Sequence, residues 1–202
     1  LMSGSGHPES ADLTGHSAAY ILQQLEDFRT GARKDSARMN GIVGGMSDEE
    51  MRKAAEWFAA LKAKPWTKVV EAATVPKTFV GGGRMRFASP EGGTEPIGNR
   101  IITLPENQER ATKRDPHSGF IAYVPQGSLA KGEALVKNGG NGKTVACALC
   151  HGDTLTGLGN VPRIAGLHPI YIVRQLYLFK DSFRNGPDAQ LMKKPVRSEE
   201  HT

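Results

Sequence analysis

An internal repeat constrains the fold of this 202-residue chain more than any other feature of its sequence. Residues 166–200 match residues 15–50 in a register of 151 residues, set by Gly15 with Gly166 and by Phe28 with Phe179. The same register aligns Tyr20-Ile21 with Tyr171-Ile172 and Gln24-Leu25 with Gln175-Leu176. After a two-residue slip, Met39 aligns with Met192, and Ser47 with its following acids aligns with Ser198-Glu199-Glu200. Self-similarity over this length predicts two copies of one domain.

Apolar residues recur at helical spacing in three segments. The first segment covers residues 16–30. The second opens with Ser47 and Glu50, a capping-box pair in which each side chain can bond the other residue's backbone N–H, and it must end before Pro65. The third covers residues 129–137 and stops at a Gly-rich stretch. These patterns predict a mainly helical protein.

The middle of the chain has a different character. Seven of the twelve prolines fall within residues 64–125, together with two Gly-Gly stretches, and this density excludes a long helix. Residues 68–70, 100–103 and 120–124 are short and β-branched or aromatic, so they are expected to be extended and can pair as a small ribbon. We therefore expect helical domains over residues 1–63 and 127–202, joined by a Pro/Gly-rich, partly extended connector over residues 64–126.

Composition narrows the class of protein. The chain is 38% hydrophobic and 23% charged, as expected of a soluble globular protein with a real core. It contains no apolar run of about 18 residues and no signal peptide. The net charge is +5, but no basic block of the kind found in nucleic-acid-binding arms occurs. The positive net charge favours acidic protein partners, and the absence of a basic block argues against nucleic acid.

Both cysteines of the chain lie in one motif, Cys147-Ala148-Leu149-Cys150-His151. The pattern C-x-x-C-H is the covalent attachment site of c-type haem. Two thiols three residues apart in a turn of helix can both add to the vinyl groups of the porphyrin, and the adjacent histidine then lies beneath the iron as its proximal ligand. Haem attachment accounts for all five positions.

Three other interpretations account for fewer residues. A zinc site of Cys147, Cys150 and His168 lacks a fourth ligand. A dithiol oxidoreductase using Cys147 and Cys150 would place its motif after a buried strand, whereas a polar Gly-rich loop precedes it here. Residues 139–144 resemble the end of a phosphate-binding loop, but the required first glycine is Lys137.

The chain resembles the di-haem class I c-type cytochromes of bacteria, which hold two cytochrome c domains in tandem. Besides C-x-x-C-H, the resemblance rests on Gly152, on Val161-Pro162 and Ala165-Gly166, on the helix at 171–179, on a methionine before the final helix, and on residues 95–101 and 119–125 of the connector. It covers nearly the whole chain. The fold class that it implies is two tandem cytochrome c-like helical domains.

The resemblance also implies roles for individual residues. Met192, 41 residues after His151, is expected as the distal iron ligand, with simple packing as its alternative. The backbone carbonyl of Pro162 is expected to accept from the imidazole of His151, against the alternative of a plain loop proline. In the first copy Met39 is preferred to Met46 as the counterpart of Met192. Three further expectations concern packing: Met51 in the core, Tyr171 and Phe179 in the haem pocket or the core, and His168 on the surface or in a loop.

The first copy has no C-x-x-C-H motif in this sequence. Equal copy lengths would place the missing histidine immediately before Leu1, so the chain is expected to be a fragment cut at both ends. One covalent haem c is expected in this chain and two in the full-length protein. Met39 would serve a second haem only if that motif were restored.

These observations predict an electron carrier rather than an enzyme. It would pass electrons between a redox donor and acceptor, with a dehydrogenase or terminal oxidase among the possible partners. The alternatives are a haem-bearing electron-transfer subunit of a periplasmic dehydrogenase complex, a cytochrome-type peroxidase, and the dithiol oxidoreductase above. The family resemblance implies a bacterial periplasmic location, soluble or membrane-tethered, with an export signal on the precursor.

Overall fold

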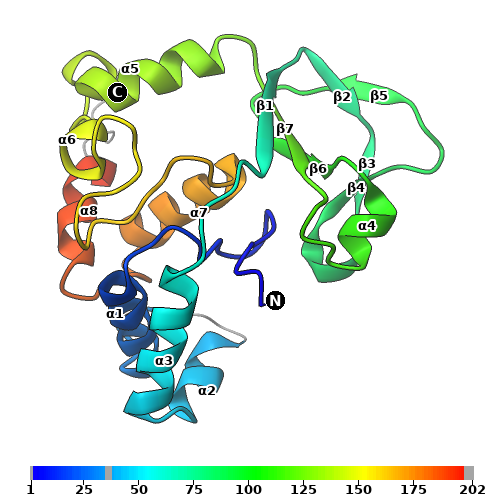
Figure 1. Cartoon of the computed structure of the whole chain (residues 1–202). Coiled ribbons are helices and arrows are strands. Elements are labelled where there is room, and N and C mark those ends of the chain that lie inside the picture. Colours follow the sequence, from blue (N-terminus) through cyan, green and yellow to red (C-terminus); the bar gives the residue numbers. More distant parts are fainter. Residues whose placement is uncertain (1, 35–37, 198–202) are drawn as a thin grey trace. The chain divides into compact units, whose positions relative to one another are not determined.

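The computed structural model describes residues 2–34 and 38–197, whose helices and strands are shown in Figure 1. The chain forms two compact units, each made from three stretches of sequence. We call residues 1–12, 64–133 and 166–172 the sheet unit, and residues 13–63, 134–165 and 173–202 the helical unit. The predicted division into residues 1–63, 64–126 and 127–202 follows the repeat along the sequence, and it stays a prediction.

The sheet unit contains the strands expected in the connector. A three-stranded sheet has the order β1-β7-β6, formed by β1 (Thr67–Glu71), β7 (Phe120–Val124) and β6 (Ile102–Pro105). β1 runs parallel to β7, and β6 runs antiparallel to it. Two antiparallel pairs complete the set: β2 (Thr74–Pro76) with β5 (Thr94–Pro96), and β3 (Thr78–Val80) with β4 (Arg86–Ala88). Strands form at 67–71 and 120–124 as predicted, while the segment predicted at 100–103 is shifted to Ile102–Pro105, and the three strands form one sheet.

β7 is the central strand because it pairs with β1 along one edge and with β6 along the other, and it packs one face against the core. Phe120, Ala122 and Val124 are buried while the residues between them are partly exposed, the period-two pattern of a strand packed on one face. Two apolar clusters form the core: Val75, Ile97, Ile102 and Leu104, and Met85, Phe87, Ala111 and Phe120. A short 3₁₀ turn, η1 (Gly82–Arg84), lies between β3 and β4.

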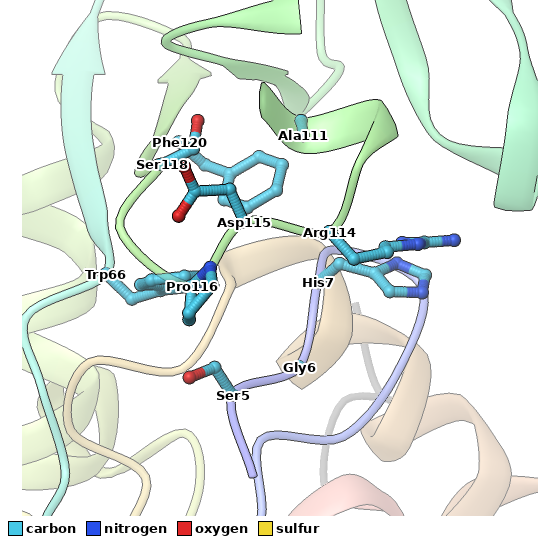
Figure 2. A pocket seen from close by; sticks show the side chains of 10 residues that line it. All are labelled: Ser5, Gly6, His7, Trp66, Ala111, Arg114, Asp115, Pro116, Ser118 and Phe120. Carbon is cyan, nitrogen blue, oxygen red and sulfur yellow. The ribbon is translucent and has the colours of Figure 1, made fainter. Parts of the chain in front are cut away.

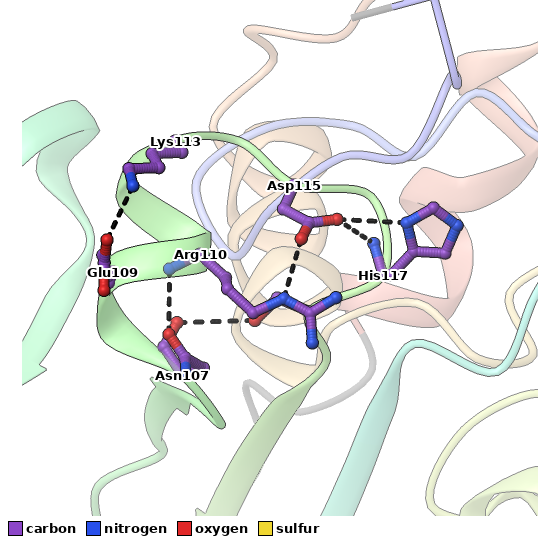
Figure 3. A network of polar contacts seen from close by, with 7 residues as sticks. Asn107, Glu109, Arg110, Lys113, Asp115 and His117 are labelled. Atoms are coloured by element: carbon purple, nitrogen blue, oxygen red, sulfur yellow. Dashed lines mark hydrogen bonds and ion pairs between the residues drawn. The ribbon is translucent and has the colours of Figure 1, made fainter.

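The short helix α4 (Gln108–Thr112) leads back to β7 through a polar turn (Figure 3). Asn107 Oδ1 accepts from the backbone N–H of Arg110 at 2.9 Å and caps the helix. Arg110 Nε donates to Asp115 Oδ2 at 2.7 Å, and the backbone N–H of His117 donates to Asp115 Oδ1 at 2.8 Å. The Arg110 guanidinium, followed by this backbone bond, lowers the pKa of Asp115 to about 2.

The first copy of the repeat forms three helices of the helical unit. α1 (Ala18–Arg29) is capped by Ser17, and α3 (Asp48–Ala59) begins with the predicted reciprocal capping box of Ser47 and Glu50. Between them lies α2 (Met39–Gly44), which the sequence pattern did not predict. Phe28, Val43 and Met51 form the buried core of these helices, with Leu22, Leu25, Met39 and Met46 packed against it. The core position of Met51 is confirmed, and α3 ends before Pro65 as expected.

The second copy contributes α7 (Pro169–Lys180) and α8 (Ala189–Arg197), which contains Pro195. α5 (Ser128–Gly142) precedes the cysteine motif, and its regular part ends at Asn138, after which Gly139, Gly140 and Asn141 have φ near +65°. The predicted stop is thereby confirmed. Ser198, Glu199 and Glu200, the predicted counterparts of Ser47 and its acids, lie outside the described residues.

The two copies meet through equivalent residues inside the helical unit. Arg33 donates to the side-chain oxygens of Gln24 and Gln175 at 2.9 and 3.2 Å, and Arg184 donates to the same two oxygens at 2.7 and 3.0 Å. The Arg33 guanidinium lies over the Phe28 ring and that of Arg184 over the Phe179 ring. This local two-fold arrangement follows the 151-residue register, so the repeat is structural as well as sequential.

The repeat also extends further toward the N-terminus than the sequence indicated. Residues 4–11 and 155–162 both begin with a residue at positive φ, Gly4 at +66° and Leu155 at +57°. His7 pairs with Ser10, and Leu158 pairs with Val161, at equivalent positions. Within the described residues, no helix is both long and apolar enough to cross a membrane.

Candidate haem site

The cysteine motif forms a single helical turn in the helical unit. Cys147 precedes α6 (Ala148–His151), and the backbone N–H of His151 donates to the Cys147 carbonyl at 3.0 Å. Gly152, at φ +81°, ends the helix directly after the histidine. Both cysteines are free thiols, Cys147 half-buried and Cys150 exposed. One turn therefore presents two thiols and an imidazole together.

The imidazole of His151 is held in one orientation. Its side chain is 7% exposed, and Nδ1 lies 2.7 Å from the Pro162 carbonyl oxygen. A carbonyl can only accept, so Nδ1 carries the proton and donates, which leaves the lone pair on Nε2. This is the contact that the family resemblance implies for Pro162. Its role toward a metal stays a prediction.

The loop that carries Pro162 is closed by its own backbone. Gly157 N–H donates to the His151 carbonyl at 2.9 Å, and the N–H groups of Ile164 and Ala165 both donate to the Leu155 carbonyl, at 2.9 and 3.0 Å. Gly157 has φ +93°, and a Cβ there would lie 2.6 Å from the Val161 carbonyl oxygen. Only glycine fits this position without displacing the loop.

Arg163 anchors the loop, and the sequence analysis did not identify it. Its side chain is buried, with Nε donating to the Thr14 carbonyl at 2.6 Å and Nη2 to Thr14 Oγ1 at 3.3 Å. These partners lie 149 residues apart in sequence, and no local pattern reports such a contact. The pair Arg33 and Arg184 was also missed, although the 151-residue register could have identified it.

The Cys147 thiol does not have the electrostatics of a redox-active nucleophile. Burial raises the pKa of the Cys147 thiol, with Cys150 adding to the shift, so Cys147 is protonated at neutral pH. A dithiol oxidoreductase requires a nucleophilic cysteine whose pKa is lowered. Among the residues that the structure describes, no cluster of three or more His, Cys, Asp and Glu side chains could hold a metal ion.

The two candidate methionines lie on helices. Met192 is half-buried on α8, and α8 is tied to the segment before the motif because Thr144 Oγ1 donates to the Pro195 carbonyl at 2.7 Å. Met39 begins α2 and packs with Met46 against the core of the first copy. The structure thus brings Cys147, Cys150, His151 and Pro162 together, while Met192 and Met39 lie on other elements. Two thiols and an oriented imidazole in one turn are the groups that attach haem c to a protein and ligate its iron.

A pocket in the sheet unit cannot take such a group (Figure 2). Its enclosed space is about 10 Å³, roughly that of one water molecule. The lining residues include Ser5, His7, Trp66 and Asp115. Trp66 Nε1 is buried there with no hydrogen-bond partner among the described residues. The pocket is a packing gap, distinct from the cysteine motif.

His168 lies in the loop before α7, as one of the two expectations had it, but it is not on the surface. Its side chain is 2% exposed, Nδ1 lies 2.8 Å from Thr67 Oγ1, and the ring packs edge-on against Phe120. Burial lowers the pKa of His168 to about 4, partly offset by Asp12. Phe179, which was left open between pocket and core, is buried under Arg184.

Comparison with known proteins agrees with this arrangement. The chain is 18% identical to cytochrome c4 of Acidithiobacillus ferrooxidans (TM-score 0.56, covering 95% of this chain and 84% of that one). It is 19% identical to reduced cytochrome c4 from Pseudomonas stutzeri (TM-score 0.60, 99% and 82%). It is also 21% identical to thiosulfate dehydrogenase (TsdBA) from Marichromatium purpuratum (TM-score 0.58, 97% and 31%).

One curated relative matches by sequence. A thiosulfate dehydrogenase electron acceptor of Thiomonas intermedia (strain K12) is 38% identical over 78 residues, which is 37% of this chain. The match spans 36% of that relative's length. No protein-family model matches the chain. The chain shares the fold of these cytochromes, and it carries a C-x-x-C-H motif at residues 147–151.

Proposed function

We propose that the chain is an electron-transfer cytochrome that carries one haem c, bound through Cys147 and Cys150. His151 would ligate the iron through Nε2. The observation that carries the proposal is the hydrogen bond of His151 Nδ1 to the Pro162 carbonyl, directly beside two free thiols. When bound, haem c supplies an iron that cycles between Fe(III) and Fe(II), so one electron moves without substrate turnover.

The chain's own residues would prepare this site in two ways. The Pro162 carbonyl fixes the tautomer and the ring plane of His151, and it makes the imidazole a stronger donor to a metal. The closed loop at residues 152–165 holds that carbonyl in place and shields the buried imidazole from water. A rigid shell of this kind limits the reorganisation that accompanies a change of iron charge.

Met192 is the proposed distal ligand. Its support is the bond from Thr144 to Pro195, which ties the helix carrying Met192 to the residues that lead into the motif. A thioether opposite histidine favours Fe(II) and raises the reduction potential. Met39 would have this role for a second haem only in a chain that restores the motif of the first copy. The full-length protein is then proposed to be a di-haem protein with domains over residues 1–63 and 127–202.

The proposed partners are redox proteins of the bacterial periplasm. The curated relative is named as the electron acceptor of thiosulfate dehydrogenase, and one solved neighbour is a thiosulfate dehydrogenase. A donor of that class is therefore the first to test, with the chain as an electron-accepting carrier or subunit. The charge of +5 favours an acidic docking surface on the donor.

Reduction by a defined donor tests this function. The holoprotein, produced with a haem-attachment system, is mixed with thiosulfate dehydrogenase and thiosulfate while the haem absorption bands are followed. The proposal predicts reduction that requires both the enzyme and thiosulfate, and that slows as salt screens the charges. The matched control is chemical reduction by dithionite. A protein that dithionite reduces but the enzyme does not is a carrier for another donor, and one that neither reduces is not an electron carrier.

A further inference from the structure

Arg163 directly follows the proline whose carbonyl holds His151, and it is one of the most buried charged residues in the chain, at 4% exposure. We propose that Arg163 is a positioning residue that clamps the Pro162 carbonyl against His151 by anchoring the loop on the first copy of the repeat. This inference rests on the proposed function, because the geometry it protects is that of the proximal imidazole.

The Arg163 guanidinium donates hydrogen bonds to two different segments, at Thr14 and at Ala165. Nε and Nη2 both donate to Thr14, to its backbone carbonyl at 2.6 Å and to Oγ1 at 3.3 Å. Nη1 donates to the carbonyl of Ala165, farther along the same loop. A planar guanidinium with fixed donor directions can hold both segments at once, whereas a lysine ammonium is a single point and cannot reproduce this fork of hydrogen bonds.

The first copy is shaped to receive this fork. Gly15 has φ +69°, and a Cβ there would lie 2.9 Å from Cδ and Nε of Arg163 and 2.9 Å from Cβ of Ala63. The backbone N–H of Gly15 donates to the Leu61 carbonyl at 3.1 Å, which holds this turn against the residues that follow α3. Thr14, Gly15 and Ala63 therefore surround the Arg163 side chain, and none of them is part of the haem motif.

Only the loop of the second copy has this anchoring arginine. In the 151-residue register Arg163 corresponds to Asp12, and Pro162 corresponds to Ala11. The loops at residues 4–11 and 155–162 share their first positive-φ residue and a pairing three residues apart, but only the second has a proline followed by an arginine. The first copy therefore acts on the iron site of the second through Thr14 and Gly15, independently of any haem of its own.

The expected consequence is on the donor strength of His151. A short bond from Nδ1–H to a carbonyl places negative character on the imidazole, which stabilises Fe(III) relative to Fe(II). If the clamp is released, the 2.7 Å contact lengthens, the imidazole becomes a poorer donor and the reduction potential rises. Loss of a cation from the same unit has the opposite electrostatic effect, since it favours the more positive Fe(III).

The test compares Arg163→Lys with Arg184→Lys in the holoprotein, because both variants keep the charge. Arg184 is also buried and forks between Gln24 and Gln175, on α1 and α7. The proposal predicts that Arg163→Lys raises the midpoint potential and makes exchange of the His151 Nδ1 proton about tenfold faster, as measured by redox titration and NMR. Arg184→Lys is expected to lower thermal stability and to leave both readouts unchanged.

Equal shifts in the two variants, or no shift in Arg163→Lys, would overturn the positioning role. If Arg163→Lys yields no folded holoprotein, Gly15→Ala is measured instead against Gly31→Ala, because Gly31 has φ +78° but open space around a Cβ. Only Gly15→Ala pushes on Arg163, so only that variant should raise the potential. A wild-type chain that takes up no haem contradicts the proposed function itself, which separates the two failures.

Discussion

The loops at residues 4–11 and 155–162 share two backbone features and differ in their chemistry. Each starts with a residue at positive φ and closes with a short pairing three residues apart, His7 with Ser10 and Leu158 with Val161. Only the second ends in Pro162 and Arg163 and follows a C-x-x-C-H motif within this sequence. The difference teaches that the repeat preserves part of the loop backbone, while Pro162 and Arg163 occur in the second loop only.

Met192 and Met39 give a second comparison between the two copies. Of the variants predicted here, replacement of Met192 by alanine is expected to have the largest effect on the haem. Met192→Ala should abolish the sulfur-to-iron charge-transfer band of the oxidised holoprotein and lower the potential, because water replaces a thioether that favours Fe(II). Met39→Ala should leave the spectrum unchanged and cost about 2 kcal/mol of unfolding free energy, because Met39 packs against the core of the first copy. Absorption spectra and urea unfolding measure the two effects. An unchanged band in Met192→Ala would assign the ligand elsewhere.

The starts of α1 and α7 differ in their response to acid. Ser17 caps α1 with its side chain, whereas the equivalent residue before α7 is the buried His168. The folded-state pKa of His168 is about 4, below its ordinary value of 6.5, so the unfolded chain binds more protons between these values. Stability is therefore expected to fall by about 3 kcal/mol as the pH drops from 7 to 4.

Urea unfolding at pH 7 and pH 4 measures this difference. His168→Gln should remove most of the pH-dependent loss. Ser17→Ala should cost about 1 kcal/mol at both pH values, since a hydroxyl cap does not titrate in this range. The same pH dependence in wild type and His168→Gln would show that another group is responsible.

The glycines within the two loops provide a smaller and more local test. A Cβ on Gly157 would lie 2.6 Å from the Val161 carbonyl oxygen, and one on Gly6 would lie 2.6 Å from the Ala11 carbonyl oxygen. Gly157→Ala should cost about 2–3 kcal/mol and Gly6→Ala about 1–2 kcal/mol, because Gly157 also has a positive φ. Only Gly157→Ala should alter the haem spectrum. Gly159→Ala is the matched control, with positive φ and open space.

Local signals in the sequence were sufficient for much of the fold. The capping box of Ser47 and Glu50, the stop after residue 137 and the three strands of the main sheet each depend on neighbouring residues, and all are present. The helix α8 was not predicted, because Pro195 normally excludes a helix interior. There the bond between Thr144 and the Pro195 carbonyl supplies tertiary support that no local pattern reports.

The residues of the candidate site also differ in whether a local sequence pattern identifies them. Cys147, Cys150 and His151 follow from a five-residue motif, because their chemistry requires that spacing. The burial of His168 and the anchoring of Arg163 depend on partners 101 and 149 residues away, so the sequence gives no sign of them. The resemblance to a family supplied Pro162, which spacing alone does not single out.

The central claim is that one copy of the repeat holds a covalent haem and the other, in this chain, does not. Intact mass spectrometry under denaturing conditions, after co-expression with a haem-attachment system, tests it most directly. We predict the mass of the chain plus one haem, and the unmodified mass when Cys147 and Cys150 are both replaced by alanine. An unmodified wild-type chain, or a haem that is lost on denaturation, would contradict the account.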